Sequence, residues 1–196
     1  MYKVIKMGYI MLNKDEEGQK TERILFESTS WKVWRTTVTE NTCFVCASMN
    51  GRIIAIGDST LNMIPVHPNC RCNAEIMIGI VAGTATSERE NGVEKYVALN
   101  GKLPEYYVLK ETAEAAGWKS KRGNLSDVMP GRVIGGDYYK NRDGRLPAKP
   151  GRIWREADFD YTGGFRNNNR LIYSNDGLLF VTYDHYCSFY EIGLEY

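Results

Sequence analysis

The chain has 196 residues, of which 43% are hydrophobic and 25% are charged, and its formal net charge at pH 7 is +1. This length is enough for one full core, or for one domain with a smaller module attached, and the composition is that of an ordinary globular protein. The near-zero charge excludes a strongly basic nucleic-acid binder. Contacts with RNA therefore have to come from local clusters of basic residues.

No apolar run approaches the roughly 20 residues of a membrane span, and no membrane partner is expected. The start of the chain, MYKVIKMGYIMLNK, is too polar for a secretory signal peptide, and its apolar stretches are too short. We therefore expect a protein that is cytoplasmic when made. Export or delivery to a target would use a route that needs no signal peptide.

The first part of the chain has the pattern of short β-structure. Residues 28–38 alternate polar and aromatic side chains, which favours a strand, although Trp31 and Trp34 also fit one face of a helix. Asn50-Gly51 is typical of a two-residue hairpin turn. The apolar run at 74–83 predicts a further strand.

Four of the five cysteines lie within thirty residues, together with one of the two histidines. The candidate metal ligands are Cys43, Cys46, His67, Cys70 and Cys72. Paired thiols followed by a second Cys/His cluster are typical of a tetrahedral zinc site, and a structural zinc could stabilise a module too small for its own core. Five candidates compete for four positions, and the spacing does not exclude one of them. The alternatives are free core cysteines or a redox pair. A catalytic zinc is not favoured, because no nearby glutamate has the place of its general base.

The strings TENTCFVCASMNGRII and PVHPNCRC in this stretch resemble the C-terminal end of the minor head proteins of tailed phages, related to Mu protein F. The resemblance covers roughly residues 22–80 and lacks the long helical body of those proteins. It implies a docking or trafficking remnant of prophage origin, with a phage capsid or a secretion system as the partner.

Composition divides the chain into two predicted domains. Residues 83–90 are small, polar and charged, and we expect a linker there between a zinc-binding module at 1–82 and a second domain at 91–196. The second domain begins with helix-like segments at 93–99 and 110–116. The stretch 119–136 is punctuated by glycine and proline, with a short helix near Leu125, and 138–150 reads as a loop.

The remainder of the second domain reads as strands. Asn175-Asp176-Gly177 separates two β-rich runs and predicts a hairpin. Helices followed by an antiparallel sheet indicate the α+β class.

The last third of the chain holds the residues that carry chemistry. Glu156 lies in a strand-like run, Arg166 and Arg170 are four residues apart, and His185 stands between an aspartate and a tyrosine. A glutamate among arginines stays ionised and basic, and a histidine, with an ordinary pKa of about 6.5, can donate a proton near neutrality. The planar guanidinium groups suit a dianionic phosphorane. Taken singly, each group could equally be a salt bridge or a solvated loop residue. Taken together, they favour cleavage of a phosphodiester.

The strings KLPEYYVLKETAEAAGW, GNLSDVMPG, IGGDYYKNRDGRLP, GRIWREADFDYTGGFRNNNR and YDHYCSFYEI closely resemble the barnase-type guanyl-specific bacterial ribonucleases. The resemblance runs in order from about Gly92 to Ile192. It implies N-terminal helices packed on a five-stranded antiparallel sheet, with RNA bound across the sheet. Members of this family cleave single-stranded RNA 3′ of guanosine through a 2′,3′-cyclic phosphate, without a metal or other cofactor.

The resemblance also implies a role for each matched residue. Glu156 is the general base and His185 the general acid, and the cations around the scissile phosphate are Lys110, Arg166 and Arg170. The substrate-binding positions are Asp137, Tyr139, Lys140, Asn141, Arg142, Asp143 and Tyr186. Asp143 is one methylene shorter than the glutamate with which the family contacts guanine, which leaves the base preference open. Cys187 would be a nucleophile only with a partner such as His185, two residues away on the expected strand.

The resulting hypothesis is a ribonuclease toxin, and such a toxin needs an inhibitor in the producing cell. By the resemblance this is a barstar-like acidic protein that covers Lys110, Arg142, Arg166, Arg170 and His185, and the barnase–barstar pair is the standard example of this charge complementarity. One alternative is a non-catalytic docking protein with a nuclease-like RNA-binding fold. Another is a zinc-dependent enzyme centred on the cysteine cluster.

Overall fold

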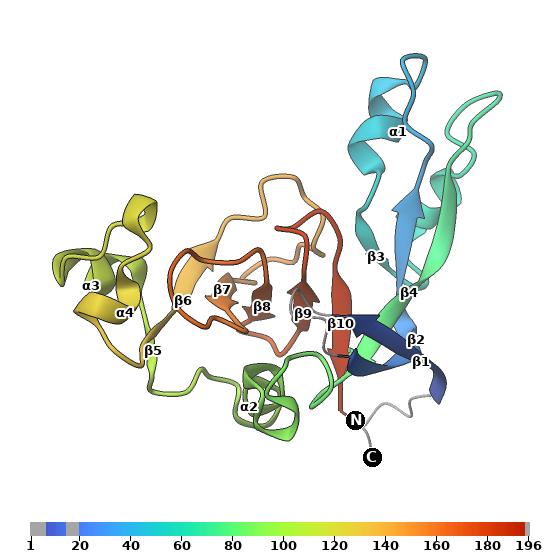
Figure 1. Ribbon diagram of the computed structural model, residues 1–196. Helices are drawn as coiled ribbons and strands as arrows, with labels where there is room; N and C mark the ends of the chain where they lie inside the picture. Colours follow the sequence, from blue (N-terminus) through green and yellow to red (C-terminus); the bar gives the residue numbers. More distant parts are fainter. Residues whose placement is uncertain (1–6, 15–19, 195–196) are drawn as a thin grey trace.

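The computed structural model describes residues 7–14 and 20–194 (Figure 1). Residues 1–6, 15–19 and 195–196 lie outside this description, and with them part of the polar start. The strands are β1 (Met7–Lys14), β2 (Lys20–Arg35), β3 (Ile53–Ala55), β4 (Asn73–Val81), β5 (Tyr107–Val108), β6 (Val133–Tyr139), β7 (Trp154–Asp158), β8 (Arg170–Ser174), β9 (Leu179–Thr182) and β10 (Tyr190–Gly193). The helices are α1 (Phe44–Met49), α2 (Val93–Asn100), α3 (Lys110–Ala115) and α4 (Leu125–Val128). This mixture agrees with the expected α+β class. None of the helices in the described part has the length and apolar content needed to cross a bilayer.

The described strands form one continuous sheet, larger than the five-stranded sheet expected from the sequence. Its order is β1-β2-β4-β10-β9-β8-β7-β6-β5, and β3 pairs additionally with β2. The five strands β6 to β10 are antiparallel, as expected. The prediction of five strands was wrong because β4 pairs with β10 in parallel, with Ile80 opposite Ile192. This pairing covers an edge that would otherwise expose unpaired backbone groups.

The local predictions succeeded where turns and periodicity were clear. The hairpin between β8 and β9 is confirmed, and so are the helices α2, α3 and α4. Strand β6 is missing from the sequence prediction because Gly135 and Gly136 interrupt its alternation. A β-bulge lies there, Gly136 has a φ of 96°, and a Cβ on Gly135 would come within 2.5 Å of the Tyr107 ring. The Asn50-Gly51 hairpin was also wrong, since this turn joins α1 to β3.

Two of the buried clusters contain residues from both predicted domains. On one face of the sheet, Leu25 and Ile80 pack with Val97 of α2, and with Leu171 and Val181. A second cluster contains Trp31, Val33, Ile53, Met77, Leu146, Trp154, Ile172, Phe180 and Phe189. The N-terminal strands therefore share a hydrophobic core with the C-terminal half, besides extending its sheet.

The expected linker is packed against the C-terminal half. Ala85 and Thr86 are buried, and the fully buried carboxylate of Glu94 accepts hydrogen bonds from the backbone N–H groups of Gly83 (3.1 Å) and Ala85 (3.3 Å) and from the Thr86 hydroxyl (2.8 Å). Residues 83–86 are thus tied to the start of α2. The division of the chain into two domains stays a prediction.

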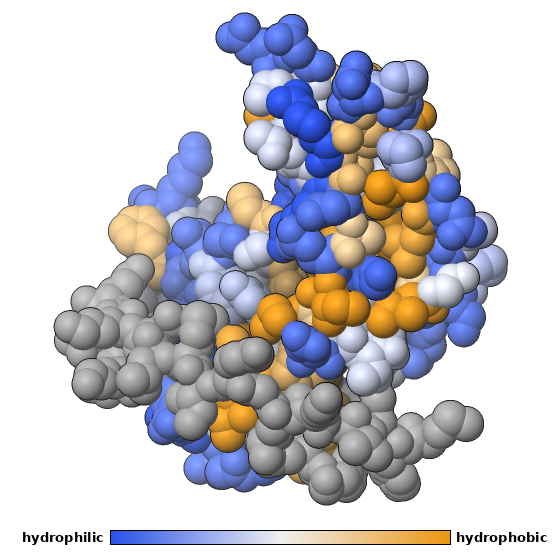
Figure 2. Space-filling model, turned by 90° about the vertical axis from the view of Figure 1, so that its right-hand side faces the viewer, coloured by the Kyte–Doolittle hydropathy of each residue, from blue (hydrophilic) through white to orange (hydrophobic). Residues whose placement is uncertain are grey.

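The part that projects from this common body is the lobe of residues 36–72, at the top of Figure 1. A small buried cluster joins it to Trp34 of β2 and contains Cys46, Met49, Ile54 and Cys72 of the lobe. Figure 2 shows the molecule from the right-hand side of Figure 1, where apolar surface lies at mid-height between polar groups. Exposed apolar residues of the N-terminal half include Phe44 (84% exposed), Ile56 and Ile76.

Candidate active site

Glu156 lies on β7, near the middle of the five antiparallel strands. Its Cα is opposite Asp137 on β6 and Ile172 on β8, and the residue is 8% exposed. The Lys110 ammonium group binds its Oε1 atom. The Tyr186 hydroxyl donates a hydrogen bond to Oε2 at 2.6 Å. Two predicted site residues from distant parts of the chain thus hold the carboxylate of the third.

These contacts decide the charge of Glu156. Burial raises its pKa, but the hydrogen bonds from Lys110 and Tyr186 and the charges of Lys110 and Arg166 outweigh burial, so the pKa of Glu156 lies below its ordinary value. The carboxylate is therefore ionised at neutral pH and can accept a proton. Conversely, burial and the neighbouring Glu156 charge raise the pKa of Tyr186, which keeps the hydroxyl as a donor.

A second buried carboxylate, Asp158, orients both predicted arginines. It is 1% exposed and lies opposite Arg170 in the β7–β8 ladder. Arg166 binds it through two hydrogen bonds of 2.6 Å, from Nε and Nη2. Nε of Arg170 lies 3.0 Å from its Oδ1 atom. Asp158 is two residues from Glu156 on the same strand, so both carboxylates lie on one face of the sheet.

The other N–H groups of the two arginines either bind backbone carbonyls or have no partner in the described part of the chain. Nη1 of Arg170 donates to the backbone carbonyls of Asn167 (2.7 Å) and Asn169 (2.6 Å). No bond from Nη1 of Arg166 or Nη2 of Arg170 occurs within residues 7–14 and 20–194. These two N–H groups could therefore bind an anion without breaking the ion pairs with Asp158.

His185 lies in the turn between β9 and β10 and is exposed. It has a φ of 53° and Tyr186 a φ of 72°, a conformation that costs non-glycine residues about 1–3 kcal/mol each. The Asp184 carboxylate compensates by accepting hydrogen bonds from the Thr182 hydroxyl, at 2.8 Å, and from the Ser188 N–H and hydroxyl groups. The His185 ring lies 4.7 Å from the Tyr186 ring. Because this segment is a turn and not a strand, the expected shared strand face of His185 and Cys187 was wrong.

The predicted base-recognition residues 139–143 begin at the end of β6 and continue into the loop of residues 140–146, called the recognition loop below. Tyr139, at the end of the strand, stacks on Tyr186 with ring centroids 5.1 Å apart. The Asn141 side chain spans the loop, accepting from the N–H of Leu146 (3.0 Å) and donating to its carbonyl (2.8 Å). Asn141 therefore shapes the loop.

In the same loop, the side chains that could contact a nucleobase of RNA are exposed to solvent. Lys140, Arg142 and Asp143 are all exposed. On the neighbouring strand, Asp137 accepts a hydrogen bond from the backbone N–H of Lys110 at 3.1 Å, which places Lys110 at the first position of α3. The structure thus brings Lys110, Asp137, Glu156 and Tyr186 into one connected group.

Three positioning residues were missed by the sequence prediction. Asp158 and Asp184 act through buried or turn contacts, and their only sequence signal is their spacing from Glu156 and His185. Arg145 is the third. Its guanidinium group donates to the backbone carbonyls of Tyr186, at 3.3 Å, and of Cys187. Its own carbonyl accepts from the N–H of Ile53 in β3 at 2.7 Å. Arg145 therefore links the recognition loop, the His185 turn and the N-terminal half.

The five metal-ligand candidates gather in the lobe of residues 36–72, far along the chain from Glu156. Their donor atoms form two overlapping groups that share Cys46, the first with Cys43 and His67 and the second with Cys70 and Cys72. None of the predicted catalytic residues belongs to these groups. The possible metal ligands and the predicted catalytic residues are thus two separate sets.

Comparison with known proteins agrees with this geometry in the C-terminal half. The model of the ribonuclease family matches residues 90–193. A ribonuclease of Heyndrickxia coagulans is 50% identical over 102 residues, which cover 52% of this chain and 94% of the relative. Ribonucleases of Bacillus intermedius and Bacillus pumilus are also 50% identical over 102 residues, and the match spans 63% of their length. These matches concern the C-terminal half, and the resemblance of residues 22–80 to phage minor head proteins stays a prediction.

Proposed function

The chain belongs to the ribonuclease family, and from this premise we propose that it is a metal-independent endoribonuclease that cleaves single-stranded RNA, preferably 3′ of guanosine. The observation that carries the proposal is the pair of carboxylates on β7. Glu156 is held ionised by Lys110 and Tyr186, and Asp158 orients Arg166 and Arg170 beside it. A base and two fixed guanidinium groups are the parts that phosphodiester cleavage requires.

In the proposed first step, the Glu156 carboxylate takes the proton of the ribose 2′-hydroxyl. The 2′-oxygen attacks the phosphorus atom, and the charge that develops on the phosphorane is stabilised by Lys110, Arg166 and Arg170. His185, in its cationic form, gives its proton to the departing 5′-oxygen, which leaves a 2′,3′-cyclic phosphate. In the second step the roles reverse. His185 takes a proton from water, which attacks the cyclic phosphate, and Glu156 returns its proton to the 2′-oxygen.

We further propose that the recognition loop contacts the base. The exposed side chains of Arg142 and Asp143 are free to meet a guanine edge, while Asn141 holds the loop. The carboxylate of Asp143 can accept hydrogen bonds from guanine N–H groups, but its reach is shorter than that of glutamate. Asp143→Glu should therefore sharpen the preference for guanosine, measured as the ratio of kcat/KM on GpU and ApU.

The test of the whole proposal is a set of initial rates on the dinucleotides GpU, ApU, UpU and CpU, with EDTA present, for wild type and His185→Ala. Rapid cleavage of GpU that is lost in the variant supports a metal-free guanyl-preferring ribonuclease. Equal rates on all four substrates would keep the mechanism and remove the specificity. Absence of cleavage would favour the alternative of a docking protein with a nuclease-like RNA-binding fold.

A toxin role and an acidic, barstar-like inhibitor complete the proposal. Lys110 binds Glu156, and His185 adjoins Tyr186, which binds the same carboxylate. An acidic partner that covers these residues with Arg142, Arg166 and Arg170 would block RNA and associate rapidly through charge complementarity, although Arg170 is 3% exposed and would contribute mainly through its charge. Expression of the wild-type chain should arrest growth of the host. The Glu156→Ala variant should not, and co-expression of a barstar-type inhibitor should restore growth. Arrest of equal strength by the variant would contradict toxicity through RNA cleavage.

A further inference from the structure

The lobe of residues 36–72 has an unusually small apolar core for the length of chain that it orders. Of the four residues that it contributes to its buried cluster with Trp34, two are cysteines, and the 3-10 turn Ser59–Met63 contributes no buried residue. A segment of this size cannot be stabilised by apolar burial alone and ordinarily depends on a metal or disulfides. The described cysteines are free thiols, so no disulfide bond supplies this stabilisation.

Sulfur and nitrogen donors gather in the lobe in two groups that meet at Cys46, one with Cys43 and His67 and the other with Cys70 and Cys72. The Sγ atoms of Cys43 and Cys46 each lie 3.3 Å from Nε2 of His67, and Sγ of Cys46 lies 3.8 Å from Sγ of Cys70. With Zn–S distances of about 2.3 Å and Zn–N distances of about 2.0 Å, neighbouring donors of a tetrahedral zinc lie about 3.5 to 3.8 Å apart. The observed separations are close to that range.

Backbone groups around the cysteines and His67 favour the protonation states that metal ligands need. The N–H of Cys46 points at Sγ of Cys43 and the N–H of Cys72 at Sγ of Cys70, each at 3.4 Å. Such N–H groups stabilise thiolate charge. Nδ1 of His67 lies 2.8 Å from the carbonyl oxygen of Pro68, so Nδ1 carries the proton and Nε2 presents its lone pair to the cysteines. A backbone carbonyl that fixes the tautomer is the usual outer contact of a metal-bound histidine.

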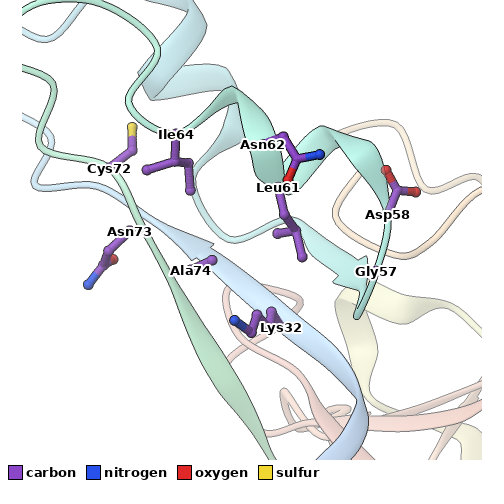
Figure 3. A pocket seen from close by; sticks show the side chains of 9 residues that line it. All are labelled: Lys32, Gly57, Asp58, Leu61, Asn62, Ile64, Cys72, Asn73 and Ala74. Atoms are coloured by element: carbon purple, nitrogen blue, oxygen red, sulfur yellow. The ribbon is translucent and has the colours of Figure 1, made fainter.

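We propose that this cluster is a structural zinc site with Cys43, Cys46, His67 and Cys70 as its four ligands, and that Cys72 is not a ligand. Cys70 has the short contact with Cys46 and the backbone N–H at its sulfur. Cys72 also lies within 4.8 Å of Cys46 and Cys70, but it lines an open groove of about 530 Å³ beside Ile64 (Figure 3), and its backbone N–H supports the Cys70 sulfur. The zinc ties α1 to the turn of residues 67–70, the two sides of the lobe.

The test uses the full chain with Glu156→Ala as a common background, so that toxicity does not limit expression. Single Cys→Ser changes at positions 43, 46, 70 and 72, and His67→Asn, are purified and their zinc content is measured after gel filtration. We expect one zinc per chain in the background protein and in Cys72→Ser. We expect loss of that zinc in each of the other four. Cys187→Ser, outside the lobe, is the control for cysteine removal and should keep its zinc.

Cobalt replacement provides a second readout that does not depend on retention during purification. The strong visible absorption of tetrahedral Co²⁺ bound to thiolates should appear in Cys72→Ser and be lost or weakened in Cys70→Ser. The reverse order of these two variants would overturn the choice of ligands. Absence of zinc and of a tetrahedral cobalt spectrum in the background protein, or a Cys46–Cys70 disulfide detected by mass spectrometry, would overturn the site. None of these outcomes depends on RNA cleavage.

Discussion

The two halves of the chain use buried polar groups in different ways. In the C-terminal half, buried carboxylates hold charged partners, since Glu156 binds Lys110 and Asp158 binds two arginines. In the lobe of residues 36–72, the corresponding polar groups are thiols and one imidazole around a small core. In the C-terminal half, each of these buried carboxylates has a cationic partner that offsets the cost of burying its charge. In the lobe, a bound metal cation would have that role for the thiols.

The two halves are also joined to each other by backbone hydrogen bonds. Strand β4 extends the C-terminal sheet, and the N–H of Ile53 in β3 binds the carbonyl of Arg145 in the recognition loop. The lobe thus projects from a body to which the N-terminal strands already belong (Figure 1). We therefore expect changes in the C-terminal ion pairs to affect activity and folding together, and changes at the metal-ligand candidates of the lobe to affect stability and not the chemical step.

The largest effect is expected at Asp158. Asp158→Ala removes the partner of Arg166 and leaves Arg170, which is 3% exposed, as a buried charge without its carboxylate. Loss of one member of a buried pair costs about 3–5 kcal/mol, so the free energy of unfolding in urea should fall by that amount. Activity should fall as well, because both guanidinium groups lose their orientation. Asp127→Ala, at an exposed aspartate of α4, is the matched control. Full stability in Asp158→Ala would show that the buried pairs do not hold this half.

The next effect is at Glu94, which joins residues 83–86 to α2. Glu94→Ala removes the acceptor of three hydrogen bonds and leaves buried N–H groups unsatisfied, at a cost of about 2–3 kcal/mol. Urea unfolding followed by tryptophan fluorescence should remain a single transition with a lower midpoint. Glu111→Ala, at an exposed glutamate, is the control. Two separate transitions in the wild type would contradict a core shared by the two halves.

A smaller effect is expected at Arg145, a positioning residue between the recognition loop and the His185 turn. Arg145→Ala should cost about 1 kcal/mol of stability and raise KM for RNA more than it lowers kcat, because the loop is loosened while Glu156 is untouched. Arg145→Lys should recover part of the loss. Arg132→Ala is the matched control, because it also removes a hydrogen bond from a guanidinium group to a backbone carbonyl, that of Glu105, outside the recognition loop and the His185 turn. Equal kinetic changes in both variants would rule out the positioning role.

The smallest change concerns the pH profile of Tyr186→Phe. The variant loses the hydrogen bond that lowers the pKa of Glu156, so this pKa should rise and the acidic limb of kcat/KM should move to higher pH. The lowered pKa of Glu156 also makes the stability of the folded state depend on pH. A carboxylate with a lowered pKa in the folded state stabilises the protein above the unfolded pKa, and this stability is lost as the pH falls through the folded pKa. Tyr138→Phe, at an exposed ring, should leave the limb unchanged. An acidic limb that stays in place in Tyr186→Phe would mean that Glu156 does not set it.

The parts that could be predicted from sequence were those with local signals. Asn175-Asp176-Gly177 predicted the β8–β9 hairpin, and glycine stops predicted the ends of α2 and α3. The parallel pairing of β4 with β10 joins residues more than a hundred positions apart and leaves no trace in local periodicity. Residues such as Asp158 and Arg145 act through contacts that only the fold creates. The five metal-ligand candidates were visible as a set, but the choice among them depends on distances.

We propose that the Glu156 carboxylate is the general base of a metal-free ribonuclease. The most direct test is the initial rate of GpU cleavage in EDTA for wild type, Glu156→Ala and Glu114→Ala, the last being the same change at an exposed glutamate of α3. Removal of a general base typically costs about 10² to 10⁴ in rate, so Glu156→Ala should lose activity by that factor while Glu114→Ala keeps the wild-type rate. A Glu156→Ala protein that is folded and cleaves GpU at the wild-type rate would show that Glu156 is not the general base.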